Sequence, residues 1–98
     1  MTKKIIIIGS GFSSISASTY LADKGYDVTI LEKNKSFGGR ARKFKEQGFT
    51  FDMGPSWYWM PDVFEKYFND FNKSVDDYYT LKKLDPAYRV YFAKNDFI

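Results

Sequence analysis

The apolar positions in the first third of the chain follow two different rhythms. Ile5–Ile8 is a continuous β-branched run that ends at a glycine, which predicts a short parallel strand buried on both faces. Over Phe12–Lys24 the apolar positions recur at helical spacing. Val28–Leu31 is a second short apolar run. Residues 3–32 are therefore expected to form a strand–helix–strand (βαβ) unit.

A different pattern follows the second apolar run. Arg42–Gln47 and Phe49–Asp52 resemble two short strands that meet at Gly48, which predicts a hairpin. Pro61 suits the first position of a helix, and an apolar stripe with polar residues opposite it extends this predicted helix over residues 61–71. The middle of the chain is therefore expected to be a hairpin followed by an amphipathic helix.

The last quarter of the chain predicts two more strands, Tyr79–Leu84 and Tyr88–Phe92, joined through Asp85-Pro86. No segment after the βαβ unit has the pattern of a parallel strand followed by a packing helix, although a doubly wound sheet needs further strands. The expected fold class is α/β, namely the N-terminal part of a Rossmann-type domain followed by the start of a mixed α+β region. We expect the chain to be the N-terminal piece of a larger protein, and inactive by itself.

The composition excludes several kinds of catalytic, metal-binding and nucleic-acid-binding site. The 98 residues include no Cys and no His, which excludes disulfides, thiolate metal sites, cysteine nucleophiles and serine-type triads, so no metal site is expected. The net charge of +3 is small, and the chain contains no block of five like charges, so nucleic-acid binding is not expected. The N-terminal apolar run is too short for an export signal or a membrane span, which favours a cytoplasmic location.

Gly9-Ser10-Gly11 lies between the first strand and the first helix, as in a dinucleotide-binding turn. The first glycine allows the tight turn, the second lets a pyrophosphate approach the backbone, and the helix N-terminus attracts the phosphates. Ser14 stands where the fingerprint has Gly or Ala. The alternative interpretation is a glycine-rich turn with no ligand, which is common in βα units.

Glu32 supports the ligand-binding interpretation. It follows the second strand at close to the spacing of about 20 residues that the fingerprint expects. A carboxylate at this place accepts hydrogen bonds from ribose hydroxyls and repels a 2′-phosphate, so an NADP-type ligand is disfavoured. The alternative is a solvated strand end. We expect a dinucleotide that contains adenosine diphosphate.

Gly38-Gly39-Arg40 comes soon after the acid. Adjacent glycines let the backbone pass close to a ligand, and the arginine brings a fixed cation towards diphosphate oxygens. A plain turn with a solvated arginine explains the same residues equally well. The residues by themselves therefore leave a flavin and a nicotinamide dinucleotide both open.

Several stretches together carry a family resemblance. They are Gly9-Ser10-Gly11, Glu32-Lys33, Phe37–Ala41, Gly48–Ser56, Trp57–Pro61 and Asp85-Pro86 with the following Tyr88-Arg89-Val90. They resemble the FAD-binding N-terminus of the carotenoid (phytoene) desaturases of bacteria, which are similar to the wider amine oxidase-like flavoproteins. The resemblance covers essentially all of the chain.

The resemblance implies an FAD-dependent oxidoreductase, most closely a phytoene desaturase that introduces double bonds into a lipophilic polyene. It implies a partial FAD-binding domain over residues 1–56 and the beginning of a substrate domain over 57–98. The catalytic residues, and any contact with a membrane, are expected beyond residue 98. The alternatives are another flavoprotein oxidase of the amine oxidase type and a catalytically inert fragment. The implied cofactor contacts are Gly9, Gly11, Phe12, Ser13, Ser14, Glu32, Lys33, Gly38, Gly39, Arg40, Gly54, Pro55 and Ser56.

The aromatic run Trp57-Tyr58-Trp59 has two interpretations. It could line an apolar channel for a polyene, or it could pack between two domains. Packing is the more common role of such residues.

Overall fold

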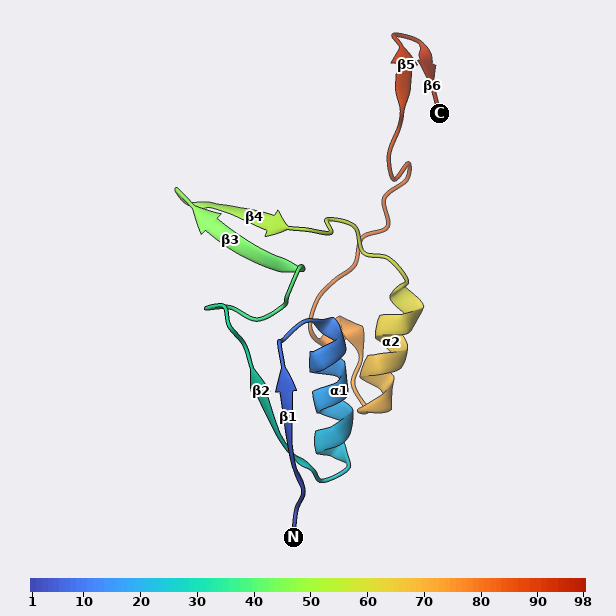
Figure 1. The fold of residues 1–98 in the computed structure, drawn as a ribbon. Helices are drawn as coiled ribbons and strands as arrows, with labels where there is room; N and C mark the ends of the chain where they lie inside the picture. Colours follow the sequence, from blue (N-terminus) through green and yellow to red (C-terminus); the bar gives the residue numbers. More distant parts are fainter. The chain divides into compact units, whose positions relative to one another are not determined.

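The computed structural model describes residues 1–98, which divide into two compact units (Figure 1). The first unit is Met1–Met60 and the second is Pro61–Ile98. The first contains β1 (Lys4–Ile8), α1 (Phe12–Asp23), β2 (Asp27–Leu31), β3 (Arg42–Glu46) and β4 (Phe49–Met53). The second contains α2 (Pro61–Asp70), the 3₁₀ turn η1 (Val75–Asp77), β5 (Tyr91–Ala93) and β6 (Asp96–Phe97). Each unit is described by itself.

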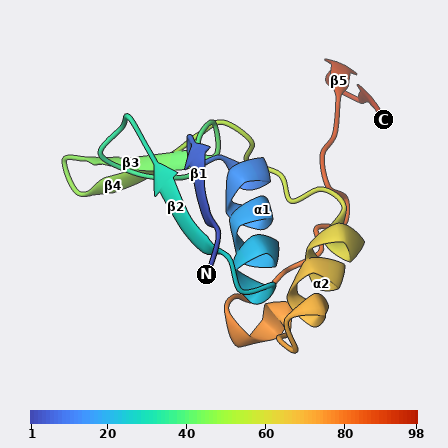
Figure 2. The same cartoon turned by 60° about the horizontal axis from the view of Figure 1, so that its bottom comes forward.

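The predicted βαβ unit is confirmed. Strands β1 and β2 pair in parallel, with Ile5 opposite Val28 and Ile7 opposite Ile30. Figure 2 shows α1 alongside this two-stranded sheet, where it contacts both strands. The chain leaves α1 through Gly25, whose positive φ of 83° lets it turn back towards β2.

The expectation that the first strand is buried on both faces is wrong. Ile5 and Ile7 are half-buried, whereas Ile6 and Ile8 are 65% and 85% exposed. The reason is that α1 covers one face of the sheet, and no helix of this unit covers the other. Burial on both faces of a parallel sheet requires helices on both sides.

The predicted hairpin is also confirmed. Strands β3 and β4 pair antiparallel with Phe44 opposite Phe51, and these two rings stack with their centroids 5.0 Å apart. Gln47 and Gly48 form the turn, both with positive φ. A two-residue turn with left-handed backbone matches the twist of the paired strands, which explains why the chain reverses here.

The predicted amphipathic helix forms as α2, which begins at Pro61. Its half-buried residues are Phe64, Tyr67 and Phe68. Phe68 contacts the ring of Tyr78, with centroids 5.0 Å apart. The turn η1, which the sequence analysis did not predict, buries Val75 and is closed by a capping box between Ser74 and Asp77.

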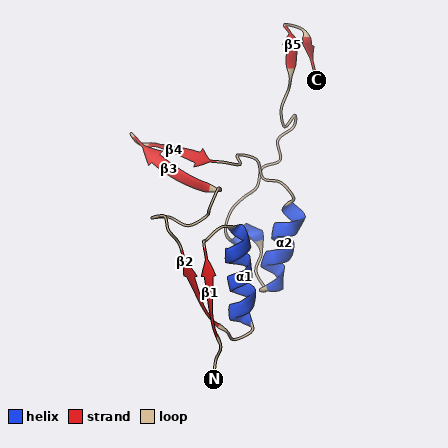
Figure 3. Cartoon of the chain, viewed as in Figure 1, coloured by secondary structure: helices blue, strands red, loops and turns tan.

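The prediction that Tyr79–Leu84 and Tyr88–Phe92 form two strands joined through Asp85-Pro86 is wrong. The observed hairpin joins β5 and β6 across Lys94-Asn95, and Tyr79–Leu84 is an irregular segment (Figure 3). A strand needs a neighbour to satisfy its backbone groups, and β6 supplies that neighbour only for the end of the second predicted strand. Tyr79 instead contacts the ring of Phe68 in α2.

Candidate functional site

The glycine turn after β1 is held by backbone hydrogen bonds to two other segments. The N–H of Gly9 donates to the carbonyl of Leu31 at 2.7 Å, which ties the turn to the end of β2. The N–H of Gly38 donates to the carbonyl of Ser10 at 2.8 Å, which ties it to the Gly38-Gly39 loop. Gly9 has φ +90°, a conformation that favours glycine. The turn, the end of β2 and the double-glycine loop therefore form one local structure.

The amino end of α1 emerges from this turn without a side-chain cap. Gly11 is the N-cap residue, it makes no side-chain capping hydrogen bond, and the first turn carries no acidic residue. The backbone N–H groups of a first helical turn lack intrahelical partners and carry the positive end of the helix dipole. This end of α1 is therefore suited to bind an anion such as a diphosphate.

Gly11 is a glycine for which the fold gives no steric reason. Its φ of −75° and ψ of 177° are open to any residue, and a Cβ added here would meet no atom within 4 Å. The space next to it is open on the side where a ligand would approach the helix end. A glycine at this position would allow a ligand to approach the backbone closely.

Gly11→Ala is accordingly expected to lower the free energy of unfolding by no more than about 1 kcal/mol, the difference between glycine and alanine as N-cap residues, because the added methyl group enters open space. If this turn binds the diphosphate that the sequence predicts, the same change should weaken nucleotide binding about tenfold or more, since the methyl group would obstruct the phosphates. Urea unfolding and calorimetric titration measure the two effects. A much larger loss of stability would contradict the open space next to Gly11.

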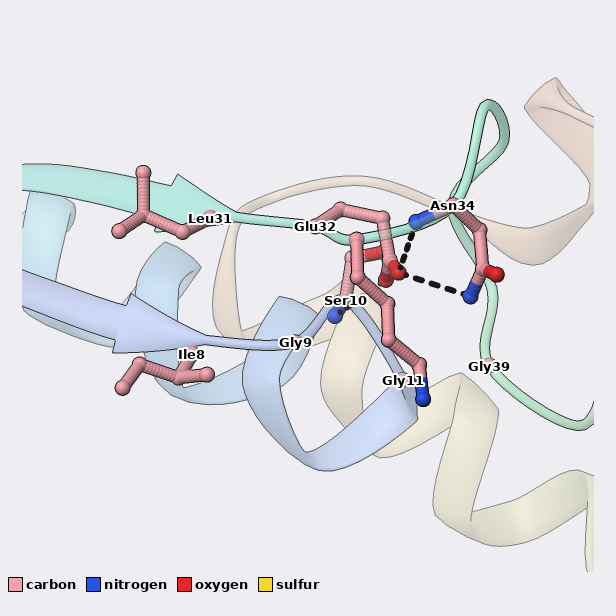
Figure 4. A pocket seen from close by; sticks show the side chains of 9 residues that line it. Ile8, Gly9, Ser10, Gly11, Leu31, Glu32, Asn34 and Gly39 are labelled. Atoms are coloured by element: carbon pink, nitrogen blue, oxygen red, sulfur yellow. Dashed lines mark hydrogen bonds between the residues drawn. The ribbon is translucent and has the colours of Figure 1, made fainter.

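Glu32 lies directly after β2 and faces the glycine turn (Figure 4). Its Oε2 accepts hydrogen bonds from the backbone N–H of Ser10 at 3.0 Å and from the Ser10 hydroxyl. Its Oε1 accepts hydrogen bonds from the backbone N–H of Asn34 at 2.9 Å and from the Asn34 side-chain amide at 3.0 Å. The alternative of a freely solvated strand end does not describe this carboxylate, which is fixed in place by four donors.

These hydrogen bonds favour the ionised carboxylate. The Ser10 hydroxyl, followed by the Asn34 backbone N–H, lowers the pKa of Glu32 from 4.5 to about 2. Because folding lowers this pKa, ionised Glu32 stabilises the folded chain fully above about pH 4.5 and loses that contribution as the pH falls towards 2. The site therefore presents a permanent negative charge at neutral pH.

We expect the carboxyl carbon of Glu32 to titrate with a midpoint near 2 in NMR spectra of ¹³C-labelled protein. In Ser10→Ala the midpoint should rise towards the ordinary value, because the largest contribution to the shift is removed. A wild-type midpoint near 4.5 would refute the arrangement of donors around Glu32.

The double-glycine loop packs tightly against the glycine turn. A Cβ on Gly39 would come within 3.1 Å of the Cα of Gly11, so the two loops approach each other backbone to backbone. The Arg42 Nε donates to the Gly39 carbonyl at 2.8 Å and holds the loop from the start of β3. Arg40 is exposed beside this contact. The glycine pair therefore has a structural role in addition to any ligand contact.

Two adjoining pockets enclose most of the predicted cofactor residues. The first, of about 380 Å³, lies between the ends of β1 and β2, and the second, of about 910 Å³, lies between the start of α1, the double-glycine loop and the end of β4. Together they are lined by eleven of the predicted positions: Gly9, Gly11, Phe12, Ser13, Glu32, Lys33, Gly38, Gly39, Arg40, Gly54 and Pro55. Ser14 and Ser56 line neither pocket. The ligand contacts of all these residues stay a prediction.

The sequence analysis missed residues that the structure places at the site. They include Ser10 and Asn34, which hold Glu32, and Arg42, which holds Gly39. A signal for Ser10 existed, because it lies between the two glycines of the turn. Asn34 gave no signal, since an asparagine after a strand is typical of any turn.

Two further observations concern other kinds of site. No group of three or more His, Cys, Asp and Glu side chains lies close enough together to hold a metal ion. Among the helices of the chain, none has the length and apolar character needed to span a membrane.

Comparison with known proteins connects this geometry to a family. Residues 7–73 match the family described as "NAD(P)-binding Rossmann-like domain". The chain is 53% identical over 92 residues to the carotenoid 3,4-desaturase of Haloarcula japonica, a match of 94% of this chain and 19% of that protein. It is 44% identical over 95 residues to a 4,4'-diapophytoene desaturase of Staphylococcus aureus, covering 97% of this chain and 19% of that protein. The chain thus spans about a fifth of the length of these relatives.

Proposed function

Since the chain belongs to the family of NAD(P)-binding Rossmann-like domains, we propose that it forms the FAD-binding part of a carotenoid desaturase. The observation that carries the proposal is the meeting of three features at the ends of β1 and β2. These are an uncapped helix end, open space at Gly11 and a fixed carboxylate at Glu32. An adenosine diphosphate group needs all three: a positive end for its phosphates, close approach to the backbone and an acceptor for its ribose hydroxyls.

The residues fit a dinucleotide of this kind. The first turn of α1 and Gly11 would hold the diphosphate, and Glu32 would hold the adenosine ribose. Arg40 would place its charge towards the diphosphate from the double-glycine loop. The second pocket, which includes Gly54 and Pro55, continues the site away from Glu32 and offers room for the rest of the cofactor.

The choice of FAD over NADP rests on charge and on similarity. An ionised Glu32 repels a 2′-phosphate, which disfavours NADP. The similarity to two proteins named as carotenoid desaturases favours a flavin, because the resemblance to that family implies FAD as the acceptor of the hydride that desaturation removes from carbon. FAD supplies the hydride acceptor when it is bound, and the residues of this chain bind and orient it.

The proposed substrate of the whole protein is a lipophilic polyene. Two observations support this substrate. Both relatives are named as carotenoid desaturases, and exposed aromatic residues follow Pro55, which lines the second pocket. Trp57 and Trp59 stack with centroids 6.1 Å apart, and both side chains are largely exposed. Exposed stacked rings of this kind suit contact with an apolar chain or with another domain.

The test of the proposed cofactor is the absorption spectrum of the purified protein. We expect a flavin spectrum, release of FAD on denaturation, and no binding of NADPH at micromolar concentration. NADP and NAD serve as matched probes, since they differ only in the 2′-phosphate that Glu32 should exclude. A colourless protein that binds NADPH with micromolar affinity would overturn the proposal.

A further inference from the structure

The carboxylate of Glu32 has no free acceptor position. A carboxylate offers about four lone-pair directions, two on each oxygen. Ser10 donates twice to Oε2, and Asn34 donates twice to Oε1 (Figure 4). A ribose diol can therefore donate to Glu32 only if one of these four donors leaves. The structure allows the donors to be ranked by how easily they can move.

Three of the four donors are fixed. The Ser10 N–H belongs to the glycine turn, whose backbone is tied to β2 and to the double-glycine loop. The Asn34 N–H lies two residues after Glu32 on the same short turn. The Ser10 hydroxyl belongs to a residue that is only 4% exposed, so neither water nor a ligand can replace it. The amide of the exposed Asn34 side chain is the donor that can rotate into solvent.

Ser10 also connects all three loops of the site. Its N–H and hydroxyl donate to Glu32 after β2, and its carbonyl accepts from the N–H of Gly38 in the double-glycine loop. The next residue, Gly11, is the N-cap of α1. The position of the carboxylate relative to the helix end is therefore set through Ser10, whose hydroxyl is already engaged with Glu32.

We propose, on the basis of the proposed dinucleotide function, that Ser10 is the residue that positions the ribose-binding carboxylate of Glu32. The Asn34 side-chain amide is a temporary donor to Oε1, and a vicinal diol of the ligand displaces it. Ser10 occupies Oε2 with two hydrogen bonds, so that Oε1 is the oxygen that faces the ligand. The Asn34 amide satisfies Oε1 in the absence of ligand and moves away when the ribose binds. Discrimination between a ribose and a sugar without hydroxyl groups then depends on Ser10, which acts through Glu32.

The test compares ADP with 2′,3′-dideoxy-ADP, which lacks both ribose hydroxyls, by calorimetric titration of the full protein freed of bound nucleotide. In the wild type we expect ADP to bind at least about tenfold more tightly, as hydrogen bonds to a charged acceptor require. In Ser10→Ala this ratio should fall to about threefold or less, while the affinity for dideoxy-ADP changes little. In Asn34→Ala the ratio should equal or exceed that of the wild type, because the diol then displaces no donor.

The ratio of the two affinities distinguishes a role of Ser10 in positioning Glu32 from a role in stabilising the fold. Both nucleotides are titrated into the same preparation, so a loss of folded protein changes the stoichiometry and not the ratio of the affinities. A Ser10→Ala variant that weakens both nucleotides equally would overturn the role of Ser10. An Asn34→Ala variant whose ratio falls as in Ser10→Ala would overturn the displacement of its amide. Failure of the underlying function is distinct, since the wild type would then bind neither nucleotide.

Discussion

Glu32→Ala is expected to weaken retention of the dinucleotide about tenfold to a hundredfold, and Glu32→Lys is expected to weaken it further. Alanine removes the acceptor and leaves the buried Ser10 hydroxyl and N–H without their partner. Lysine adds a cation that can accept no hydrogen bond from a ribose or from Ser10. The measurement is flavin occupancy after gel filtration, taken from the ratio of flavin to protein absorbance.

A matched control for these variants is Glu65→Ala, which removes an exposed carboxylate from α2 in the second unit. Its flavin occupancy should equal that of the wild type. If both Glu32 variants also retained full occupancy, Glu32 would have no part in binding, and the site at the ends of β1 and β2 would lose its main support.

Gly54→Ala is expected to destabilise the first unit by about 1–3 kcal/mol and to disrupt the second pocket. A Cβ on Gly54 would overlap the backbone carbonyl oxygen of Arg40, so the double-glycine loop and the end of β4 would have to separate. Backbone atoms cannot rotate away as the end of a side chain can, which makes the cost high. Urea unfolding monitored by intrinsic fluorescence measures the loss of stability, and flavin occupancy measures the loss of the pocket.

Gly48→Ala is the matched control for this overlap. Gly48 also has a positive φ, of 84°, but a Cβ there would meet no atom within 4 Å. Its substitution therefore carries only the cost of the left-handed backbone, about 1 kcal/mol. Gly48 lines neither pocket, so flavin occupancy should stay at the wild-type level. Equal loss of occupancy in the two variants would contradict the contact between Gly54 and Arg40.

The local elements of this chain can be predicted from its pattern of apolar and polar residues. The β-branched run of β1, the helical periodicity of α1 and the glycines that bound them carry enough information to predict the βαβ unit. The turn at Gly48 predicts its hairpin in the same way. These features depend on residues close together in the chain, where the period of the apolar positions and the backbone preferences of glycine and proline decide the conformation. Glu32 was predictable because its spacing from the glycine turn follows from the length of one helix and one strand.

The partners that these elements meet follow from the three-dimensional arrangement of the chain. Ile6 and Ile8 are exposed because a single helix covers the sheet, and β5 pairs with β6 because that strand supplies the hydrogen-bonding edge which Tyr79–Leu84 lacks. The two Ser10 donors to Glu32 and the approach of Gly54 to Arg40 join residues that are far apart in the sequence. Such contacts depend on where separate loops lie in space, and no local pattern of apolar or polar residues encodes that position.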